Sequence, residues 1–177
     1  YPLDSHIIYA NYLEAIIYFE QISDEKKDLE PLIKAQEKIN FFLKNYPNSD
    51  YATDLEFKKN FIENQLAAKE LFIARYYMSL KKWVPAIKRL KNIVEKYENT
   101  IFIEEALHRL VEIYYKIGLE KESETYAKIL GYNYNSSEWF EMSYKFFNKD
   151  YVIKKKSNQK KKEERDGTIE KIINKIK

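Results

Sequence analysis

The stretch Asn45–Asp54, NYPNSDYATD, places Tyr-Pro and a small polar residue between two segments of helical character. The same pattern, a tyrosine followed three residues later by Asp, Ser or Thr, recurs as Tyr1–Asp4, Tyr46–Ser49, Tyr97–Thr100 and Tyr134–Ser137. These polar residues favour helix N-termini, because their side-chain oxygens accept hydrogen bonds from unpaired N–H groups of the first turn. Each phrase therefore predicts a helix that is capped by its small polar residue.

A second pattern precedes the last three of these tyrosines. A small residue is followed at four, seven and eleven positions by two further apolar residues and the tyrosine, in three sets: Ala35, Ile39, Phe42, Tyr46; Ala86, Leu90, Ile93, Tyr97; and Ser123, Ala127, Leu130, Tyr134. This spacing places each set on one face of a helix. It resembles the second helix of a tetratricopeptide repeat, whose small residue lets two helices approach closely. We expect these residues to pack between helices.

The composition also favours helices, since three Gly and four Pro accompany 33% charged residues in 177. We therefore predict an all-α fold, a tetratricopeptide-like array of helical hairpins (an α-solenoid). About three repeats, at 1–45, 46–96 and 97–133, precede a final helix at 136–148. The tyrosines are 45, 51 and 37 residues apart, against 34 in a standard repeat. Because Tyr51–Leu80 contains neither Gly nor Pro, it predicts one helix of about 45 Å.

The last part of the chain, 149–177, differs from the repeats at 1–148. It is rich in lysine and low in core-forming residues, which predicts a disordered tail. Within it, 168–177 has isoleucines spaced for one helical face, at Ile169, Ile172, Ile173 and Ile176. This pattern favours a short amphipathic helix that forms on a partner.

The sequence offers no set of residues for catalysis. It has no cysteine, no glycine-rich phosphate loop and no His-Glu metal helix. His108 stands near Glu104, Glu105 and Glu112, but a metal site there needs a further ligand, so a histidine on the polar face is favoured. Carboxylates such as Glu120, Glu122 and Glu124 are best interpreted as the solvated side of a helix. We predict no enzyme, no metal and no cofactor.

Nucleic-acid binding is disfavoured as well. The sixteen tyrosines invite base stacking, but many of them occupy repeat positions where packing explains them. The tail interleaves its lysines with Glu163, Glu164 and Asp166, which weakens a phosphate track. The formal net charge of +3 adds no argument for such a partner.

Helical arrays act by presenting a surface, so the function indicated here is binding. The segment Lys81–Ile93, KKWVPAIKRLKNI, turns its packing residues inward and leaves Lys88, Arg89 and Lys91 beside the packing stripe. Arginine can form a forked pair with a partner carboxylate, which lysine cannot reproduce. From the residues alone, a plain solvated role for such an arginine is favoured over docking.

Several of these residues together resemble the BamD family of outer-membrane protein assembly factors, over about 1–140. The specific pieces are Tyr46–Ser49 with Tyr51, the LAxxE of Leu66–Glu70, the AxYY of Ala74–Tyr77, and Trp83-Val84 leading to Arg89. The resemblance implies a periplasmic lipoprotein of five repeats at the outer membrane of a Gram-negative bacterium. A lipidated N-terminal cysteine would anchor it, and that cysteine is absent from this chain.

The resemblance also implies partners. The family works with the barrel insertase BamA, and with other subunits of the assembly machinery, to fold and insert outer-membrane proteins. Unfolded outer-membrane proteins are expected on two upstream repeats that this chain lacks. Arg89, flanked by Lys88 and Lys91, matches the family arginine that pairs with an acidic residue on the last periplasmic domain of BamA. The alternative is a general tetratricopeptide-repeat adaptor for another protein or peptide.

Overall fold

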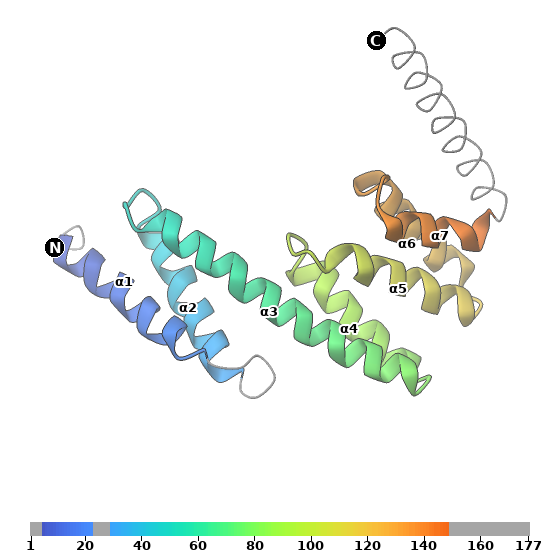
Figure 1. Ribbon diagram of the computed structural model, residues 1–177, viewed down its shortest axis with the longest axis horizontal. Helices are drawn as coiled ribbons and strands as arrows, with labels where there is room; N and C mark the ends of the chain where they lie inside the picture. Colours follow the sequence, from blue (N-terminus) through green and yellow to red (C-terminus); the bar gives the residue numbers. More distant parts are fainter. Residues whose placement is uncertain (1–4, 23–28, 149–177) are drawn as a thin grey trace, which may run out of the picture. The chain divides into compact units, whose positions relative to one another are not determined.

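The computed structural model describes residues 5–22 and 29–148, which form helices without any strand and confirm the all-α prediction. Their bounds are Ser5–Glu20 (α1), Glu30–Asn45 (α2), Ala52–Ser79 (α3), Trp83–Lys96 (α4), Ile103–Lys116 (α5), Glu120–Asn133 (α6) and Glu138–Phe147 (α7) (Figure 1). The chain divides into an N-terminal unit, 1–106, and a C-terminal unit from Leu107. The predictions for Tyr1, Asp4 and the tail at 149–177, with its helix at 168–177, lie outside the described residues. Among the helices described, none has the length and apolar character of a membrane span.

The tyrosine phrase forms the same turn at all three of its described occurrences. The tyrosine ends a helix, and its N–H donates to the carbonyl four residues earlier over 2.8 or 2.9 Å. Three residues further on, the N–H of the polar residue donates back to the tyrosine carbonyl, over 3.2, 3.1 and 3.1 Å, in the turns at Tyr46, Tyr97 and Tyr134. The phrase is therefore a repeated connection between one hairpin and the next helix.

Among the three described phrases, the predicted capping role of the polar residue holds only at Ser137. Its extended backbone (φ −78°, ψ 152°) lets Oγ accept from the N–H of Phe140 at 3.1 Å. For Ser49 and Thr100 the prediction is wrong, since their helices begin three residues later. Their carbonyls, not their hydroxyls, accept the first N–H, from Ala52 at 3.0 Å and from Ile103 at 3.3 Å. Oγ of Ser49 is buried without a hydrogen bond, and Oγ1 of Thr100 donates to a carbonyl at 2.7 Å.

This difference predicts opposite effects of two equivalent substitutions. Ser137→Ala should lower the free energy of unfolding by about 1 kcal/mol, because it removes a true N-cap. Ser49→Ala should cost nothing or stabilise slightly, because a buried hydroxyl without a partner has already lost its bond to water. Urea unfolding followed by circular dichroism measures both. An equal loss in the two variants would contradict the assigned caps.

The core of the N-terminal unit is built on the predicted small-large-large face of α2. Ala35, Ile39 and Phe42 are fully buried, and they cluster with Ala15 of α1 and with apolar residues of α3. α3 is a single helix of 28 residues, as predicted, and spans about 42 Å. Its first half packs on α2 and its second half runs beside α4 (Figure 1).

The second hairpin repeats this arrangement. On α4, Ala86, Leu90 and Ile93 are fully buried. The connection from α3 is tight, because Lys81 takes a left-handed conformation (φ 57°) and the N–H of Lys82 donates to a carbonyl of α3 at 2.9 Å. α4 is thereby folded back along α3, and the residues between its buried positions face outward.

In the C-terminal unit, a hydrogen bond and a ring stack join α5 to α6. Oγ of Ser123, which is fully buried, donates to the carbonyl of Val111 at 2.9 Å. The rings of Tyr114 and Tyr126 stack with centroids 5.6 Å apart and planes within 4°. Leu130 is fully buried on the same α6. Ala127, by contrast, is only half-buried, and it lies in an open groove between α6 and α7.

Candidate protein-docking groove

The three basic residues selected from the sequence line one groove of about 720 Å³ in the N-terminal unit. Lys88, Arg89 and Lys91 reach it from α4, while α3 contributes Glu70 and Tyr77. We call this site the α4 groove. The residues meet there because the buried stripe of α4 faces α3, so that the intervening side chains border the seam between the two helices.

The α4 groove also has an apolar end. Val84 is 79% exposed at the start of α4, and Pro85 and Ile87 line the groove beside it. A large aliphatic side chain left in water is a common feature of interaction surfaces when it adjoins convergent polar groups. The groove therefore suits a partner segment that carries both an apolar and an acidic side chain.

Arg89 is held by a carboxylate of its own chain. Its Nη1 donates to both carboxylate oxygens of Glu70, at 3.1 and 3.2 Å, from a side chain that is 42% exposed. Glu70 itself is mostly covered, at 16%. Within the described residues Nη1 makes this contact, which leaves the other N–H groups of the guanidinium for a second carboxylate. Glu70 belongs to the LAxxE pattern of the sequence, but that pattern does not predict the pairing with Arg89.

Tyr97 lies near the same carboxylate. Burial raises the pKa of its hydroxyl, and the negative charges of Glu70 and Glu63 raise it further. The hydroxyl therefore stays protonated across the physiological range, and no proton transfer in this range disturbs the charges at the groove. The electrostatics of the site come from its lysines, Arg89 and the glutamates.

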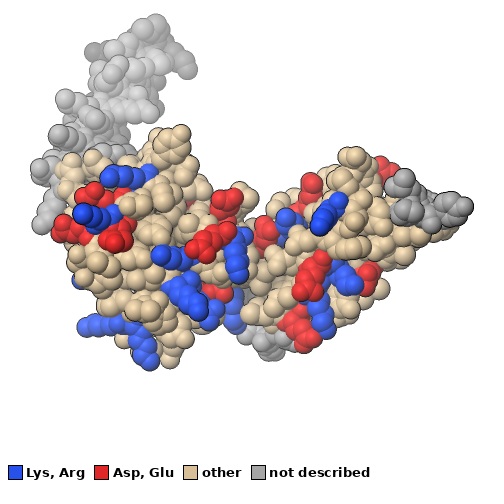
Figure 2. Space-filling model, turned by 180° about the vertical axis from the view of Figure 1, so that it is seen from behind, with Lys and Arg blue, Asp and Glu red and all other residues tan. Residues whose placement is uncertain are grey.

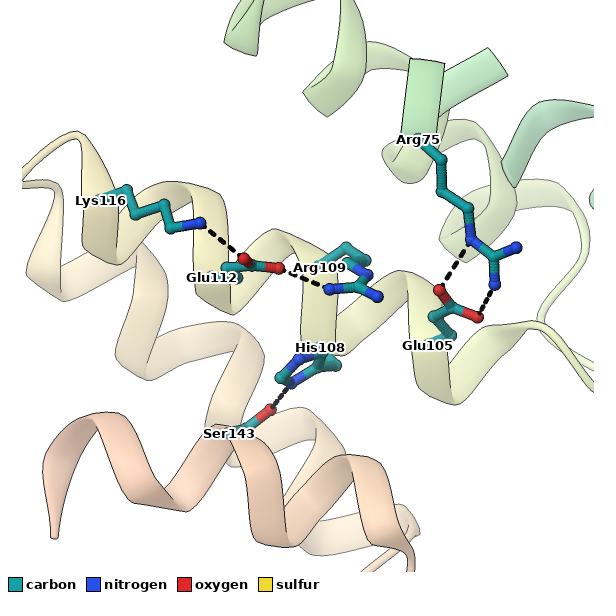
Figure 3. A network of polar contacts seen from close by, with 7 residues as sticks. All are labelled: Arg75, Glu105, His108, Arg109, Glu112, Lys116 and Ser143. Atoms are coloured by element: carbon teal, nitrogen blue, oxygen red, sulfur yellow. Dashed lines mark hydrogen bonds and ion pairs between the residues drawn. The ribbon is translucent and has the colours of Figure 1, made fainter. Parts of the chain in front are cut away.

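The polar clusters drawn in Figure 3 lie outside the α4 groove and stabilise the fold. In the N-terminal unit, Nε of Arg75 donates to Glu105 at 3.0 Å, and its Nη2 pairs with the second oxygen of the same carboxylate. In the C-terminal unit, Glu112 accepts from Arg109 at 2.8 Å and from Lys116 at 2.6 Å. Burial favours a higher pKa for the Glu112 carboxyl, but these two cations outweigh it and lower the pKa.

His108 does not lie on a polar face, so that prediction is wrong. It is 5% exposed, and its Nδ1 lies 2.8 Å from Oγ of Ser143 on α7 (Figure 3). The ring of Trp139 packs against it at 5.2 Å between centroids. Burial under α7 could not be foreseen from the neighbouring glutamates on α5. In the part of the chain that is described, no three His, Asp or Glu side chains gather as a metal site.

Charged side chains on the face seen in Figure 2 form groups that are separated by uncharged surface. Most groups contain both acidic and basic side chains, and several basic side chains lie close together toward the bottom of the view. Glu120, Glu122 and Glu124 on α6 are exposed to solvent, and Glu124 pairs loosely with Lys128 at 3.4 Å. A local groove, rather than a wide charged surface, is thus the feature that can select a partner.

The stacked hairpins and their surface groove define a tetratricopeptide-like helical-repeat protein of the kind that binds other proteins. The family model YfiO, described as an outer membrane lipoprotein, matches residues 1–129. The chain therefore belongs to the YfiO family, whose relatives carry the name BamD.

Two of these relatives are "Outer membrane protein assembly factor BamD" of Caulobacter vibrioides and of Rickettsia prowazekii. The first is 38% identical over 148 residues, covering 84% of this chain and 48% of the relative. The second is 35% identical over 145 residues, covering 82% and 58%. The protein of the same name from Neisseria gonorrhoeae is 26% identical over 147 residues, covering 77% and 55%. The chain spans about half the length of these relatives.

Proposed function

We propose that this chain is part of a scaffold of the β-barrel assembly machinery, and that it docks the barrel insertase BamA. In this role it supports the folding and insertion of outer-membrane proteins and catalyses no reaction. It works on the periplasmic side of the outer membrane of a Gram-negative bacterium. Support comes from its family, whose curated relatives are outer membrane protein assembly factors.

The observation that carries the docking proposal is the position of Arg89. It stands in the α4 groove with one edge of its guanidinium on Glu70 and with Lys88 beside it. An incoming carboxylate can accept from the remaining N–H groups in a charge-assisted bond, which is about twice as strong as a neutral one. Arg89 therefore offers BamA a preformed hydrogen-bond donor for an acidic side chain.

Glu70 adds to this site by fixing the arginine before the partner arrives. An unpaired arginine loses side-chain freedom on binding, at a cost of about 0.5–1.5 kcal/mol. The contact with Glu70 is made within the chain, so part of this ordering is already complete. Val84, with its exposed side chain, then supplies apolar area beside the charged contact.

The resemblance to the BamD family implies further partners. Other subunits of the assembly machinery are expected at the same scaffold. Unfolded outer-membrane proteins and a lipid anchor in the outer membrane belong to upstream repeats and to a cysteine that this sequence does not contain. We propose these interactions for the longer protein of which such a segment is a part.

Mapping the contact by NMR tests the docking proposal. When the ¹⁵N-labelled chain is titrated with the periplasmic region of BamA from the same organism, amide signals of Val84, of residues 86–96 and of Glu70 should shift. The amides of α1 serve as the internal control and should stay in place. Shifts confined to other helices would refute docking at this groove. Binding of an unrelated peptide here, without any response to BamA, would favour the general adaptor.

A further inference from the structure

A second groove, of about 430 Å³, lies between the last two described helices of the C-terminal unit. We call it the α6–α7 groove. Ala127 and Gly131 form its wall on α6, and Phe140, Tyr144 and Phe147 form its wall on α7. A Cβ added at Gly131 would come within 2.9 Å of the Phe140 ring, so this glycine lets the aromatic ring lie against α6.

The α6–α7 groove leaves apolar surface open to solvent. Phe147 is 39% exposed, and Ala127 is only half-buried although it belongs to the packing stripe of α6. In the second hairpin the equivalent residue, Leu90, is fully buried. A helical repeat whose inner face is not buried by a neighbouring repeat can bury that face under a cover with a polar outer face. The groove is the place where such a cover would sit.

The chain itself provides a segment that can reach this place. Phe147 forms part of the wall, and a further 29 residues, 149–177, follow the last described residue, Asn148. Near their end, four isoleucines recur at the spacing of one helical face: Ile169, Ile172, Ile173 and Ile176. We propose that the segment 168–177 binds the α6–α7 groove and covers it.

The length of the connection and the size of the segment 168–177 both agree with binding at the α6–α7 groove. The connection 149–167 has 19 residues, and a flexible chain of that length spans about 24 Å on average. Tethering of this kind gives an effective concentration in the millimolar range, so even a weak contact is populated. As a helix, the ten residues 168–177 would be about 15 Å long. A groove between two short helices can accommodate a segment of that length.

Charge favours the chain's own tail over an acidic partner. The segment 149–177 has eleven Lys or Arg against five Asp or Glu. Glu124 and Lys128 both line the groove, as a pair 3.4 Å apart, and Glu120 and Glu122 are exposed earlier on the same helix. Lys175 and Lys177 flank the isoleucine face of a helical segment, one on each side, so they would lie near these carboxylates when the isoleucines enter the groove.

A spin label tests the proposal directly in the full chain. Because the sequence contains no cysteine, Lys171→Cys, on the face opposite the isoleucines, gives a single attachment point for a nitroxide. We expect the amide signals of Ala127, Gly131, Phe140 and Tyr144 to lose more than half of their intensity in the oxidised form relative to the reduced form. The amides of α2 should be unaffected.

Two variants of the labelled chain separate docking from chance proximity. Ile172→Asp combined with Ile173→Asp should restore the lost intensity at least threefold, whereas Asn174→Asp, which adds a charge on the opposite face, should leave the loss in place. Unchanged α6–α7 amide shifts away from the groove verify the fold. The proposal is overturned if the parent shows no loss, or if the isoleucine variant keeps it. It is also overturned if the loss arises only between labelled and ¹⁵N-labelled molecules, which would indicate a second copy.

Discussion

Replacing Phe42 with alanine should lower the free energy of unfolding by about 3–5 kcal/mol. Phe42 is fully buried on α2 and lies between two other rings, those of Tyr12 at 6.4 Å and Tyr46 at 5.3 Å between centroids. The substitution removes the apolar contacts and leaves a cavity that the stacked helices cannot close. Because Tyr46 begins the turn into α3, the second hairpin should also lose protection from hydrogen exchange.

Phe41 supplies a matched control for this prediction. It is the adjacent phenylalanine of the same helix, but it is 52% exposed. Phe41→Ala should therefore change the free energy of unfolding by no more than about 0.5 kcal/mol, as surface substitutions usually do. Urea unfolding of both variants provides the comparison. Similar losses in the two would contradict the assignment of Phe42 to the core.

The second large effect is expected on partner binding. Arg89→Glu should weaken association with the periplasmic region of BamA about 100-fold, or about 2.7 kcal/mol. The substitution removes the donor for the partner carboxylate and places a second negative charge beside Glu70. Isothermal titration calorimetry measures the affinity. Lys121→Glu makes the same change of charge at an exposed position of α6 outside the groove, and should alter the affinity by less than twofold.

Stability has to be measured in parallel, because Arg89→Glu breaks an ion pair. That pair is 42% exposed at Arg89, and exposed pairs contribute only about 0–1 kcal/mol to folding. We therefore expect a small loss of stability and an unchanged helical content. A large loss of helicity together with a loss of binding would mean that Arg89 acts on the fold rather than on BamA.

Periodicity made the helical faces predictable from the sequence. Ala35, Ile39 and Phe42, and the equivalent residues of α4, recur at spacings that only a helix brings to one side, and they are buried. The absence of Gly and Pro likewise predicted one long α3. These inferences use local chemistry only, which is why they hold for the helices. The exact repeat boundaries, at about 45, 96 and 133, stay predictions.

Side-chain contacts between different helices could not be predicted from the sequence. Arg75 and Glu105 are thirty residues apart, and His108 meets Ser143 at a separation of thirty-five. A single sequence does not indicate which of many charged residues will meet across such distances. The capping prediction was wrong at Ser49 although it was confirmed at Ser137. The two serines occupy the same place in the phrase, but the helix begins directly after Ser137 and three residues after Ser49. Backbone geometry, not residue type, decides whether the hydroxyl caps.

The affinity of the double variant Glu70→Arg with Arg89→Glu for the periplasmic region of BamA decides whether Arg89 contacts BamA or only joins α3 to α4. The exchange restores the ion pair within the chain but reverses the charge offered to the partner. We expect the double variant to have the unfolding free energy of the parent and to bind BamA as weakly as Arg89→Glu alone. Recovery of the parent's affinity would contradict it, because Arg89 would then serve only to tie α3 to α4.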